Sequence, residues 1–174
     1  IAIVVPFYNE ENNLVYFIKE WEKLISKKKK YKKLFFFYFI NDGSKDQSVK
    51  KIKKTCKKLQ FQIINKKNSG HGASCKFGYN FIVNNKKKFK YLLQIDSDNQ
   101  CNPFYLIKFI NLLNLKDYDF IFGYRKYRHD GYIRVLISRI LSLTFCIKKF
   151  IYIKDLNTPY RLMKIDELKK ILLD

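Results

Sequence analysis

Two aspartates that lie two positions apart are the residues of this sequence best suited to holding a metal ion. Asp96 and Asp98 directly follow the apolar run 91–95, and residues i and i+2 of an extended chain point the same way. Two carboxylates so placed suit Mg²⁺ or Mn²⁺, which accept hard oxygen ligands and leave room for phosphate oxygens. Gln100 adds a neutral oxygen. A solvated acidic turn is the alternative, because the pattern is short and common, but its place after a buried strand favours the cation site.

Two further polar segments carry groups suited to a nucleotide or a phosphate. In segment 41–46 (NDGSKD), Asp42 is suited to accept hydrogen bonds from a base or a ribose, whereas either Ser44 or Asp46 is suited to cap the next helix. The Gly-rich turn 68–74 (NSGHGAS) leads into a predicted helix and can present backbone N–H groups to phosphate. The turn matches neither the dinucleotide-binding pattern nor Walker A, so we expect phosphate contacts without either motif.

Arg125 is the arginine best placed to bind phosphate, because it follows the short apolar run 120–122 at the end of a predicted strand. A guanidinium can contact phosphate through two parallel hydrogen bonds. Taken singly, the other arginines are more simply explained as surface charges. His71 is more simply explained as a polar lining or surface residue, and His129 as a solvated one, than as metal ligands.

An alternation of apolar and amphipathic runs must position these segments. Apolar runs predict strands, and runs of helical periodicity predict helices: strands over 1–5, 34–40, 61–64, 89–95 and 120–122, and helices over 10–26, 46–59, 72–83, 103–113 and 166–172. This pattern predicts one α/β domain with a mainly parallel, Rossmann-like sheet flanked by helices. The carboxyl ends of parallel strands share one edge, so the five polar segments that follow the strands should converge on one site.

Charge and cysteine content limit the classes of function. The chain has 174 residues, and Lys+Arg 36 against Asp+Glu 15 gives a formal net charge of +21. Either an anionic partner or an AT-rich coding bias explains this excess. The lysine runs 27–33, 50–58 and 86–90 raise the alternative of a nucleic-acid-binding module, but they lie away from the carboxylate edge and no nucleic-acid motif is present, so we expect no nucleic-acid partner. Four cysteines without a CxxC pattern predict neither a disulfide framework nor a zinc site.

The segment 131–153 is apolar but carries Arg134, Arg139, Lys148 and Lys149, which argues against a bilayer-spanning helix. An amphipathic helix lying in the membrane interface is one interpretation, and an ordinary core-facing helix is the other. The sequence starts within a predicted strand, which predicts no signal peptide, and its end suggests a domain truncated at the C-terminus.

Six motifs in this order resemble family 2 glycosyltransferases, nearest the dolichyl-phosphate mannosyltransferase and polyprenyl-phosphate glycosyltransferase branch. The motifs are VVPFYNE (4–10), NDGSKD (41–46), NSGHGA (68–73), QIDSDNQ (94–100), GYR (123–125) and DLNTPYRLM (155–163). The resemblance covers nearly all of residues 1–174. It implies a catalytic domain of GT-A fold, a nucleotide-diphosphate sugar donor (GDP- or UDP-sugar) and an inverting transfer.

The resemblance also implies roles for individual residues. Asp96, Asp98 and Gln100 would hold Mg²⁺ or Mn²⁺ on the donor pyrophosphate, and Asp98, Arg125 and Asp155 would lie at the reaction centre. Contacts to the nucleotide sugar are implied for Pro6, Tyr8, Glu10, Ile40, Asp42, Asp96, Ser97, Asp98 and Arg125, and contacts to an acceptor phosphate for Arg134 and Ser138.

The acceptor implied by the resemblance is a polyprenyl or dolichyl phosphate. This would place the protein at the cytoplasmic face of the cell membrane, either peripherally or through anchoring segments outside this sequence. A phosphate acceptor is already ionised, whereas a sugar hydroxyl, as in cell-surface polysaccharide assembly, would need a base, for which Asp155 is the candidate. Departures at Asn41, Tyr124 and Pro159 bear on the acceptor more than on the fold.

Overall fold

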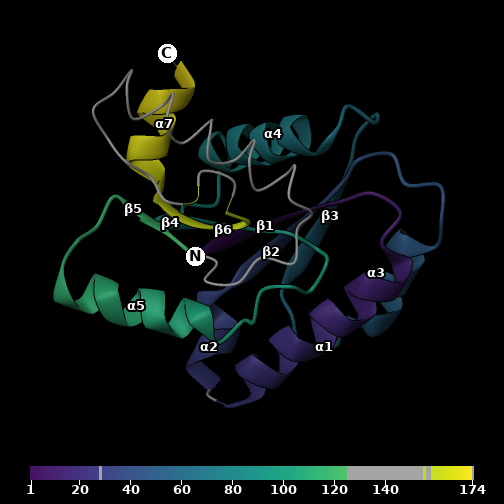
Figure 1. Cartoon of the computed structure of the whole chain (residues 1–174), viewed down its shortest axis with the longest axis horizontal. Helices are drawn as coiled ribbons and strands as arrows, with labels where there is room; N and C mark the ends of the chain where they lie inside the picture. Colours follow the sequence, from purple (N-terminus) through teal and green to yellow (C-terminus); the bar gives the residue numbers. More distant parts are fainter. Residues whose placement is uncertain (28, 125–154, 156–157, 174) are drawn as a thin grey trace. The chain divides into compact units, whose positions relative to one another are not determined.

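The computed structural model describes residues 1–27, 29–124, 155 and 158–173. The chain divides into two compact units, Ile1–Ile121 with Tyr160–Asp174, and Phe122–Pro159. The first unit holds a mixed β-sheet with helices on both faces, which is an α/β fold (Figure 1). The predicted α/β fold is therefore confirmed. The predicted helix at 131–153 lies outside the described residues.

The sheet has six strands in the order β3-β2-β1-β4-β6-β5. Strands β1 to β4 pair in parallel and β6 pairs antiparallel with β4. The strands are β1 (Ala2–Phe7), β2 (Phe36–Asn41), β3 (Phe61–Asn65), β4 (Tyr91–Ile95), β5 (Phe120–Phe122) and β6 (Tyr160–Lys164). The chain thus builds outward from β1 in one direction and then crosses to β4 on the other side, which makes β1 and β4 the topological switch point where α/β sheets bind ligands.

Pro6 fits this position in a central strand because the sheet opens there. β1 pairs with β4 only through Ala2–Val4, whereas its pairing with β2 continues to Phe7. A proline has no N–H to donate and is normally excluded from central strands. Beyond Val4, β1 has no partner on the β4 side, so Pro6 lies where the two strands have separated toward the carboxyl edge.

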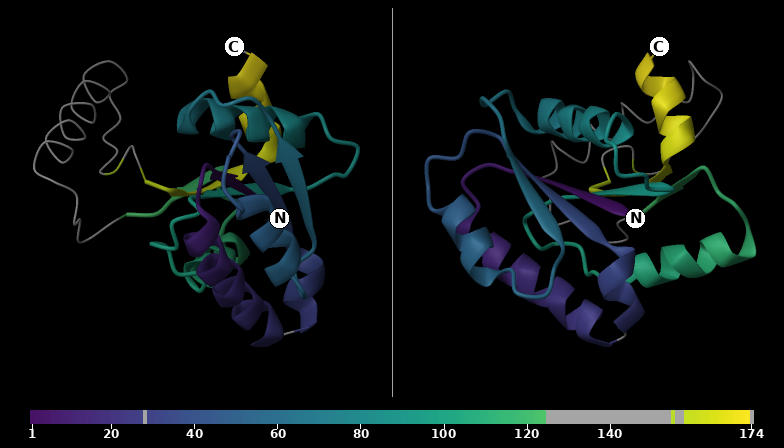
Figure 2. Two further views of the ribbon diagram at one scale, coloured as in Figure 1. Left: turned by 90° about the vertical axis from the view of Figure 1, so that its right-hand side faces the viewer. Right: turned by 180° about the vertical axis from the view of Figure 1, so that it is seen from behind.

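Helices cover the sheet in two layers (Figures 1 and 2). One face carries α1 (Glu11–Lys27), α2 (Lys29–Leu34), α3 (Ser48–Thr55) and α5 (Tyr105–Leu115), and the other carries α4 (His71–Val83) and α7 (Ile165–Leu173). Alternate residues of β1 supply the two cores: Ile3 and Val5 pack in the α1 layer, and Ala2 and Val4 in the α4 layer. On the α1 side, Trp21 packs edge-on against Phe37 with ring centroids 5.1 Å apart.

Three local features of the structure differ from what the sequence pattern predicts. The lysine-rich run after α1 forms a separate helix, α2, in which Tyr31 is buried. The predicted helix 46–59 is shorter, because Cys56 turns extended and ends α3. The strand β6 was not predicted, since its sequence YRLMK shows no continuous apolar run. Its antiparallel insertion beside β4 makes the sheet mixed rather than uniformly parallel.

Candidate functional site

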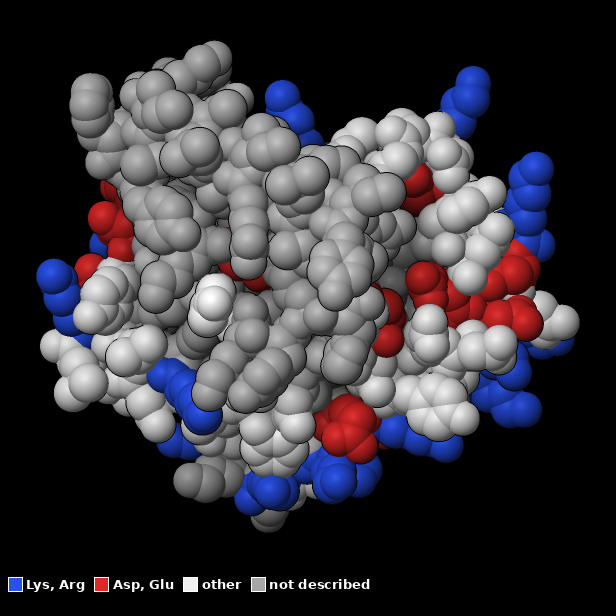
Figure 3. All heavy atoms as spheres, viewed as in Figure 1, with Lys and Arg blue, Asp and Glu red and all other residues white. Residues whose placement is uncertain are grey.

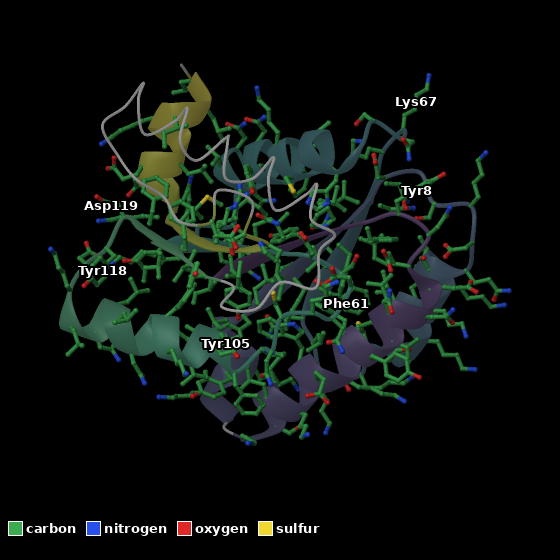
Figure 4. All side chains as sticks on the ribbon, in the orientation of Figure 1. Tyr8, Phe61, Lys67, Tyr105, Tyr118 and Asp119 are labelled. Atoms are coloured by element: carbon green, nitrogen blue, oxygen red, sulfur yellow. The ribbon has the colours of Figure 1, made fainter. Side chains whose placement is uncertain are left out.

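A cavity of about 370 Å³ lies at the carboxyl edge of the sheet and is built by four of the five predicted loops. Its size is that of a small-molecule site. Residues after β1, β2, β3 and β4 contribute to its wall: Pro6, Phe7, Tyr8, Glu10, Asp42, Asn68, Gly70, His71, Ser74 and Ser97. Tyr8 and the loop carrying Lys67 lie at the same end of the sheet (Figure 4). The exposed ring of Tyr8 is available for stacking on a planar ligand.

Hydrogen bonds join the loops after β1 and β2 into one rigid wall. Asn9 has a positive φ of 54°, its N–H donates to Ser44 Oγ (3.0 Å) and its Oδ1 accepts from Lys45 N (2.9 Å). Asp46 accepts from the N–H groups of Glu11 (3.1 Å) and Ser48 (3.0 Å). Asp46 therefore satisfies free donors at the starts of both α1 and α3, as expected for one of the two capping candidates, whereas Ser44 holds the turn at Asn9.

Asp42 is a buried residue of the cavity wall, and backbone and side-chain donors hold its carboxylate. Its carboxylate accepts hydrogen bonds from Lys66 Nζ, Ser69 N (3.0 Å) and Gly70 N (2.9 Å). Burial alone would raise the pKa of Asp42, but these hydrogen bonds outweigh burial and lower the pKa below its usual value. The side chain of Ser74, which also lines the cavity, is a fourth hydrogen-bond donor to this carboxylate.

The Gly-rich turn presents the start of α4 to the cavity. Gly70 precedes the helix with φ 90° and ψ 162°, a backbone conformation that only glycine adopts readily. The next residue, His71, is exposed and lines the cavity. The N–H groups of a first helical turn lack partners within the helix, so this end of α4 is suited to an anion.

Asp96 is held through one of its two carboxylate oxygens. Gln94 Nε2 donates to Oδ1 (2.9 Å), and His71 Nε2 lies 3.3 Å from the same oxygen. Gln94 is itself buried, and its Oε1 accepts a hydrogen bond from Tyr79 Oη (3.3 Å). Burial raises the pKa of Asp96, and the charge of Asp98 raises it further, against the lowering effects of His71 and Gln94.

Asp98 lies in the tight turn that follows β4. Its Oδ1 accepts a hydrogen bond from Gln100 N (3.0 Å), and Asn99 between them has a positive φ of 61°. The mutual repulsion of Asp96 and Asp98 is the condition that a shared cation relieves, so the pair suits Mg²⁺ or Mn²⁺. Among the described residues no three His, Cys, Asp or Glu side chains gather as a metal site. A cation here would complete its shell with neutral, water or ligand oxygens.

The structure brings together most of the predicted donor-site residues that it describes. Pro6, Tyr8, Glu10, Asp42 and Ser97 line the cavity, and Asp96 reaches it through His71. Ile40, Asp98 and Gln100 are not among the lining residues, and the side chain of Ile40 is fully buried in the core beneath α4.

The other predicted residues fall elsewhere in the chain. Arg125, Arg134 and Ser138 lie outside the described residues. Asp155 belongs to the second unit, where it is buried and its carbonyl oxygen accepts a hydrogen bond from Thr158 N (3.2 Å).

Sequence reasoning missed Lys66 and Gln94. Lys66 is one of many lysines in the chain, and nothing in its local sequence distinguishes it. Gln94 stands within an otherwise apolar strand, and this buried polar residue was a signal that pointed to a specific partner.

The fold is that of an α/β protein with a cavity at the switch point of a mostly parallel sheet, beside a carboxylate pair. The family model of glycosyl transferase family 2 matches residues 2–166. The chain belongs to this family.

Two curated relatives match the sequence. An uncharacterized protein of Methanocaldococcus jannaschii is 30% identical over 175 residues, covering 95% of this chain and 72% of the relative. The putative glycosyltransferase CsbB of Bacillus subtilis is 31% identical over 141 residues, covering 79% of this chain but only 40% of CsbB.

Solved structures share the fold at low sequence identity. Staphylococcus aureus TarS (residues 1–349) superposes with a TM-score of 0.64 at 20% identity, covering 98% of this chain and 48% of that chain. Glucosyl-3-phosphoglycerate synthase from Mycobacterium tuberculosis, in complex with UDP, has a TM-score of 0.68 at 14% identity, covering 95% of this chain and 56% of that one. This chain therefore spans about half the length of these solved proteins, and the likeness is one of GT-A fold.

Proposed function

We propose that the protein is a metal-dependent, inverting glycosyltransferase that moves a sugar from a GDP- or UDP-sugar to a polyprenyl or dolichyl phosphate. The observation that carries the donor assignment is the cavity at the β1–β4 switch point, with Tyr8 and Asp42 on one side and Ser97 next to the carboxylate pair on the other. TarS has been solved with UDP-GlcNAc, and glucosyl-3-phosphoglycerate synthase with Mn²⁺ and UDP-glucose. These complexes support a donor of the same class here.

Each part of the cavity suits one part of the donor. The ring of Tyr8 would stack on the base, and Asp42, which lines the cavity, would accept a hydrogen bond from the base or the ribose. The first turn of α4 would donate backbone hydrogen bonds to the diphosphate. Asp96 and Asp98 would hold the cation, which neutralises the charge that develops on the diphosphate as it leaves.

The acceptor determines whether the protein must supply a base. An acceptor phosphate oxygen attacks the anomeric carbon as the bond to the nucleoside diphosphate breaks, and this oxygen is already ionised near neutral pH. A sugar hydroxyl must lose its proton, and Asp155 would take it. The second candidate is therefore transfer to a non-lipid acceptor, which is supported by the fold likeness to a glucosyl-3-phosphoglycerate synthase that was solved with phosphoglyceric acid.

Ligand-induced thermal stabilisation tests the donor and metal sites. We expect UDP or GDP with Mn²⁺ to raise the melting temperature, because a ligand that binds only the native state stabilises it. Asp98→Ala should melt normally without ligand but lose the Mn²⁺-dependent part of the shift. Asp166→Ala, which removes an exposed carboxylate of α7, is the control. A full Mn²⁺-dependent shift in Asp98→Ala would refute the metal assignment, and no shift with any nucleoside diphosphate in the wild type would refute the donor class.

Transfer assays with the two acceptor classes separate the two candidate functions. Polyprenyl phosphate should be glycosylated by the wild type and, at a comparable rate, by Asp155→Asn. A steep loss of transfer in Asp155→Asn, together with turnover of a sugar hydroxyl only, would favour the second candidate.

A further inference from the structure

The helix α5 exposes an apolar stripe that the enzyme chemistry does not use. Tyr105, Leu112 and Leu115 are 52%, 39% and 83% exposed, and Lys108 lies between them. At about 100° per residue these four positions fall within roughly 80° of the helix circumference, so they form one continuous stripe. Tyr118, just after the helix, extends it, and Tyr105 and Tyr118 mark the two ends of α5 in Figure 4.

This stripe is not the face that α5 needs for folding. A separate face, roughly 110° around the helix, already buries Leu106 and Phe109 in the core. A surface helix ordinarily pairs one apolar face with one polar face, as α1 does with Lys19 and Lys23 outward. Because α5 has an exposed apolar stripe in addition to its buried face, the stripe is suited to contact an apolar or amphipathic partner.

The charges beside the stripe are positive. Lys108 Nζ lies 5.4 Å from the Tyr105 ring centroid, and Lys116 Nζ lies 5.5 Å from that of Tyr118. At the other end of the stripe, Lys27 Nζ lies 4.2 Å above the ring of Phe104, which brings the lysine-rich end of α1 next to the start of α5. Over α5, at the lower left of Figure 3, the surface is uncharged or blue.

The two acids nearest the stripe are paired with lysines. Asp117 lies 2.7 Å from Lys164 Nζ and 3.3 Å from Lys90 Nζ, and Asp119 lies 3.6 Å from Lys164 Nζ. These lysines offset the acids, so the stripe keeps a net positive border toward an anionic partner.

We propose that the outer stripe of α5 (Tyr105, Lys108, Leu112, Leu115, Lys116 and Tyr118) docks on the surface of an anionic phospholipid bilayer. Leucines would enter the boundary between headgroups and acyl chains, tyrosines would lie at headgroup depth, and lysines would face the lipid phosphates. The stripe of an 11-residue helix is about 16 Å long, which fits a surface contact and not a span. None of the helices in the described ranges is long and apolar enough to cross a membrane.

Charge favours lipid over a second protein as the occupant, because the charged members of the stripe are lysines and the neighbouring Asp117 is paired with Lys164 and Lys90. This inference rests on the proposed function in one respect: the proposed acceptor is a lipid phosphate, and such a lipid lies in a membrane. Since α5 begins shortly after the Asp96–Gln100 turn, docking along α5 would hold that turn near the bilayer.

Vesicle sedimentation without any nucleotide tests the proposal. The wild type should bind vesicles of phosphatidylcholine with phosphatidylglycerol, bind those of phosphatidylcholine alone more weakly, and dissociate with salt. The double variant Leu112→Ser/Leu115→Ser should bind the anionic vesicles roughly ten- to a hundredfold more weakly, since burial of each leucine is worth about tenfold. The matched control is Ile171→Ser/Leu173→Ser on α7, which removes two exposed apolar residues elsewhere and should bind like the wild type.

Three results would overturn the proposal. The first is equal binding of anionic vesicles by the α5 variant and the wild type, and the second is no binding by either protein. The third is that the wild type forms a dimer in sedimentation velocity and the α5 variant does not, which would assign the stripe to a second copy of the chain. Nucleoside diphosphate and Mn²⁺ should still stabilise the α5 variant, so a failure of membrane docking is distinguishable from a failure of the donor site. That same thermal measurement verifies that the variant is folded.

Discussion

Lys66 Nζ donates a hydrogen bond to the carboxylate of Asp42 in the wall of the cavity, joining the ends of β2 and β3. The same ammonium group lies 2.5 Å from Ser69 Oγ and 2.8 Å from the carbonyl oxygen of Lys67. Lys66 therefore ties the Gly-rich turn to the neighbouring strand end. The site depends on this internal ion pair as much as on the residues that face the ligand.

Replacing Lys66 by Met should lower the free energy of unfolding by about 3 kcal/mol, because it leaves the carboxylate of Asp42 buried without its counter-ion. The side chains of Lys66 and Asp42 are only 13% and 5% exposed, so solvent screens the pair little. Urea unfolding measures the loss. The matched control is Lys67→Met, an exposed neighbour that should change stability by less than about 0.5 kcal/mol. In a double-mutant cycle, Asp42→Asn should cost less in the Lys66→Met background than in the wild type; additive losses would contradict the coupling.

Acid should destabilise the loops around the cavity. Burial would raise the pKa of Asp46, as it would that of Asp42, but hydrogen bonds from Ser48 and from backbone N–H groups lower it below the unfolded value. A group whose pKa is lower in the folded state contributes stability above its unfolded pKa of about 3.9 and loses it as pH falls through the folded value. We expect Asp46→Asn to cost about 1 kcal/mol at pH 7 and progressively less below about pH 4. A constant difference for Asp46→Asn down to pH 3 would contradict the prediction.

The fold was predictable where burial imposes a pattern on the sequence. Strand β2 reads as an uninterrupted apolar run because both of its faces are covered, and the convergence of Tyr8, Asp42 and Ser97 follows from the shared edge of parallel strands. Strand β6 was not predicted because its place beside β4 depends on long-range pairing, which the five residues YRLMK do not reveal.

Within the site, residue types were predictable but their partners were not. Asp42 was recognisable as a candidate from its motif. Its partner Lys66 was not, because it lies 24 residues away and is one of many lysines in the chain. Ile40 matches the family pattern in sequence, but the alternation of side chains along β2 directs its side chain into the core. Such contacts are set by tertiary packing, which a single sequence does not encode locally.

A larger residue at Gly78 should destabilise the protein, because α4 lies against side chains of β1 and β2 there. A Cβ at this position would lie 2.6 Å from Val4 Cγ1 and 3.2 Å from Ile40 Cγ1. We expect Gly78→Ala to lower the free energy of unfolding by about 1–3 kcal/mol through overpacking. Gly72→Ala, in the same helix with open space around its Cβ, should be neutral or stabilising by up to about 1 kcal/mol. Equal effects of the two substitutions in urea unfolding would contradict the close approach.

Gln94 should act as a positioning residue for Asp96. The chain of hydrogen bonds from Tyr79 through Gln94 fixes Oδ1 of Asp96 and leaves Oδ2 for a cation. In Gln94→Met the carboxylate loses this constraint, and we expect the Mn²⁺ concentration needed for half-maximal stabilisation with UDP or GDP to rise about ten- to a hundredfold. The stabilisation by nucleotide without metal should stay as in the wild type, because Tyr8 and Asp42 are untouched.

Tyr79→Phe provides the graded comparison for Gln94→Met. It removes only the outer hydroxyl group, so Gln94 still reaches Asp96 and the Mn²⁺ requirement should rise less than in Gln94→Met. A merely structural role for Gln94 would lower the melting temperature while leaving the Mn²⁺ midpoint unchanged. That outcome would show that Asp96 is oriented by its own backbone, and the hydrogen-bond chain from α4 would then serve packing between the helix and β4 and not the metal site.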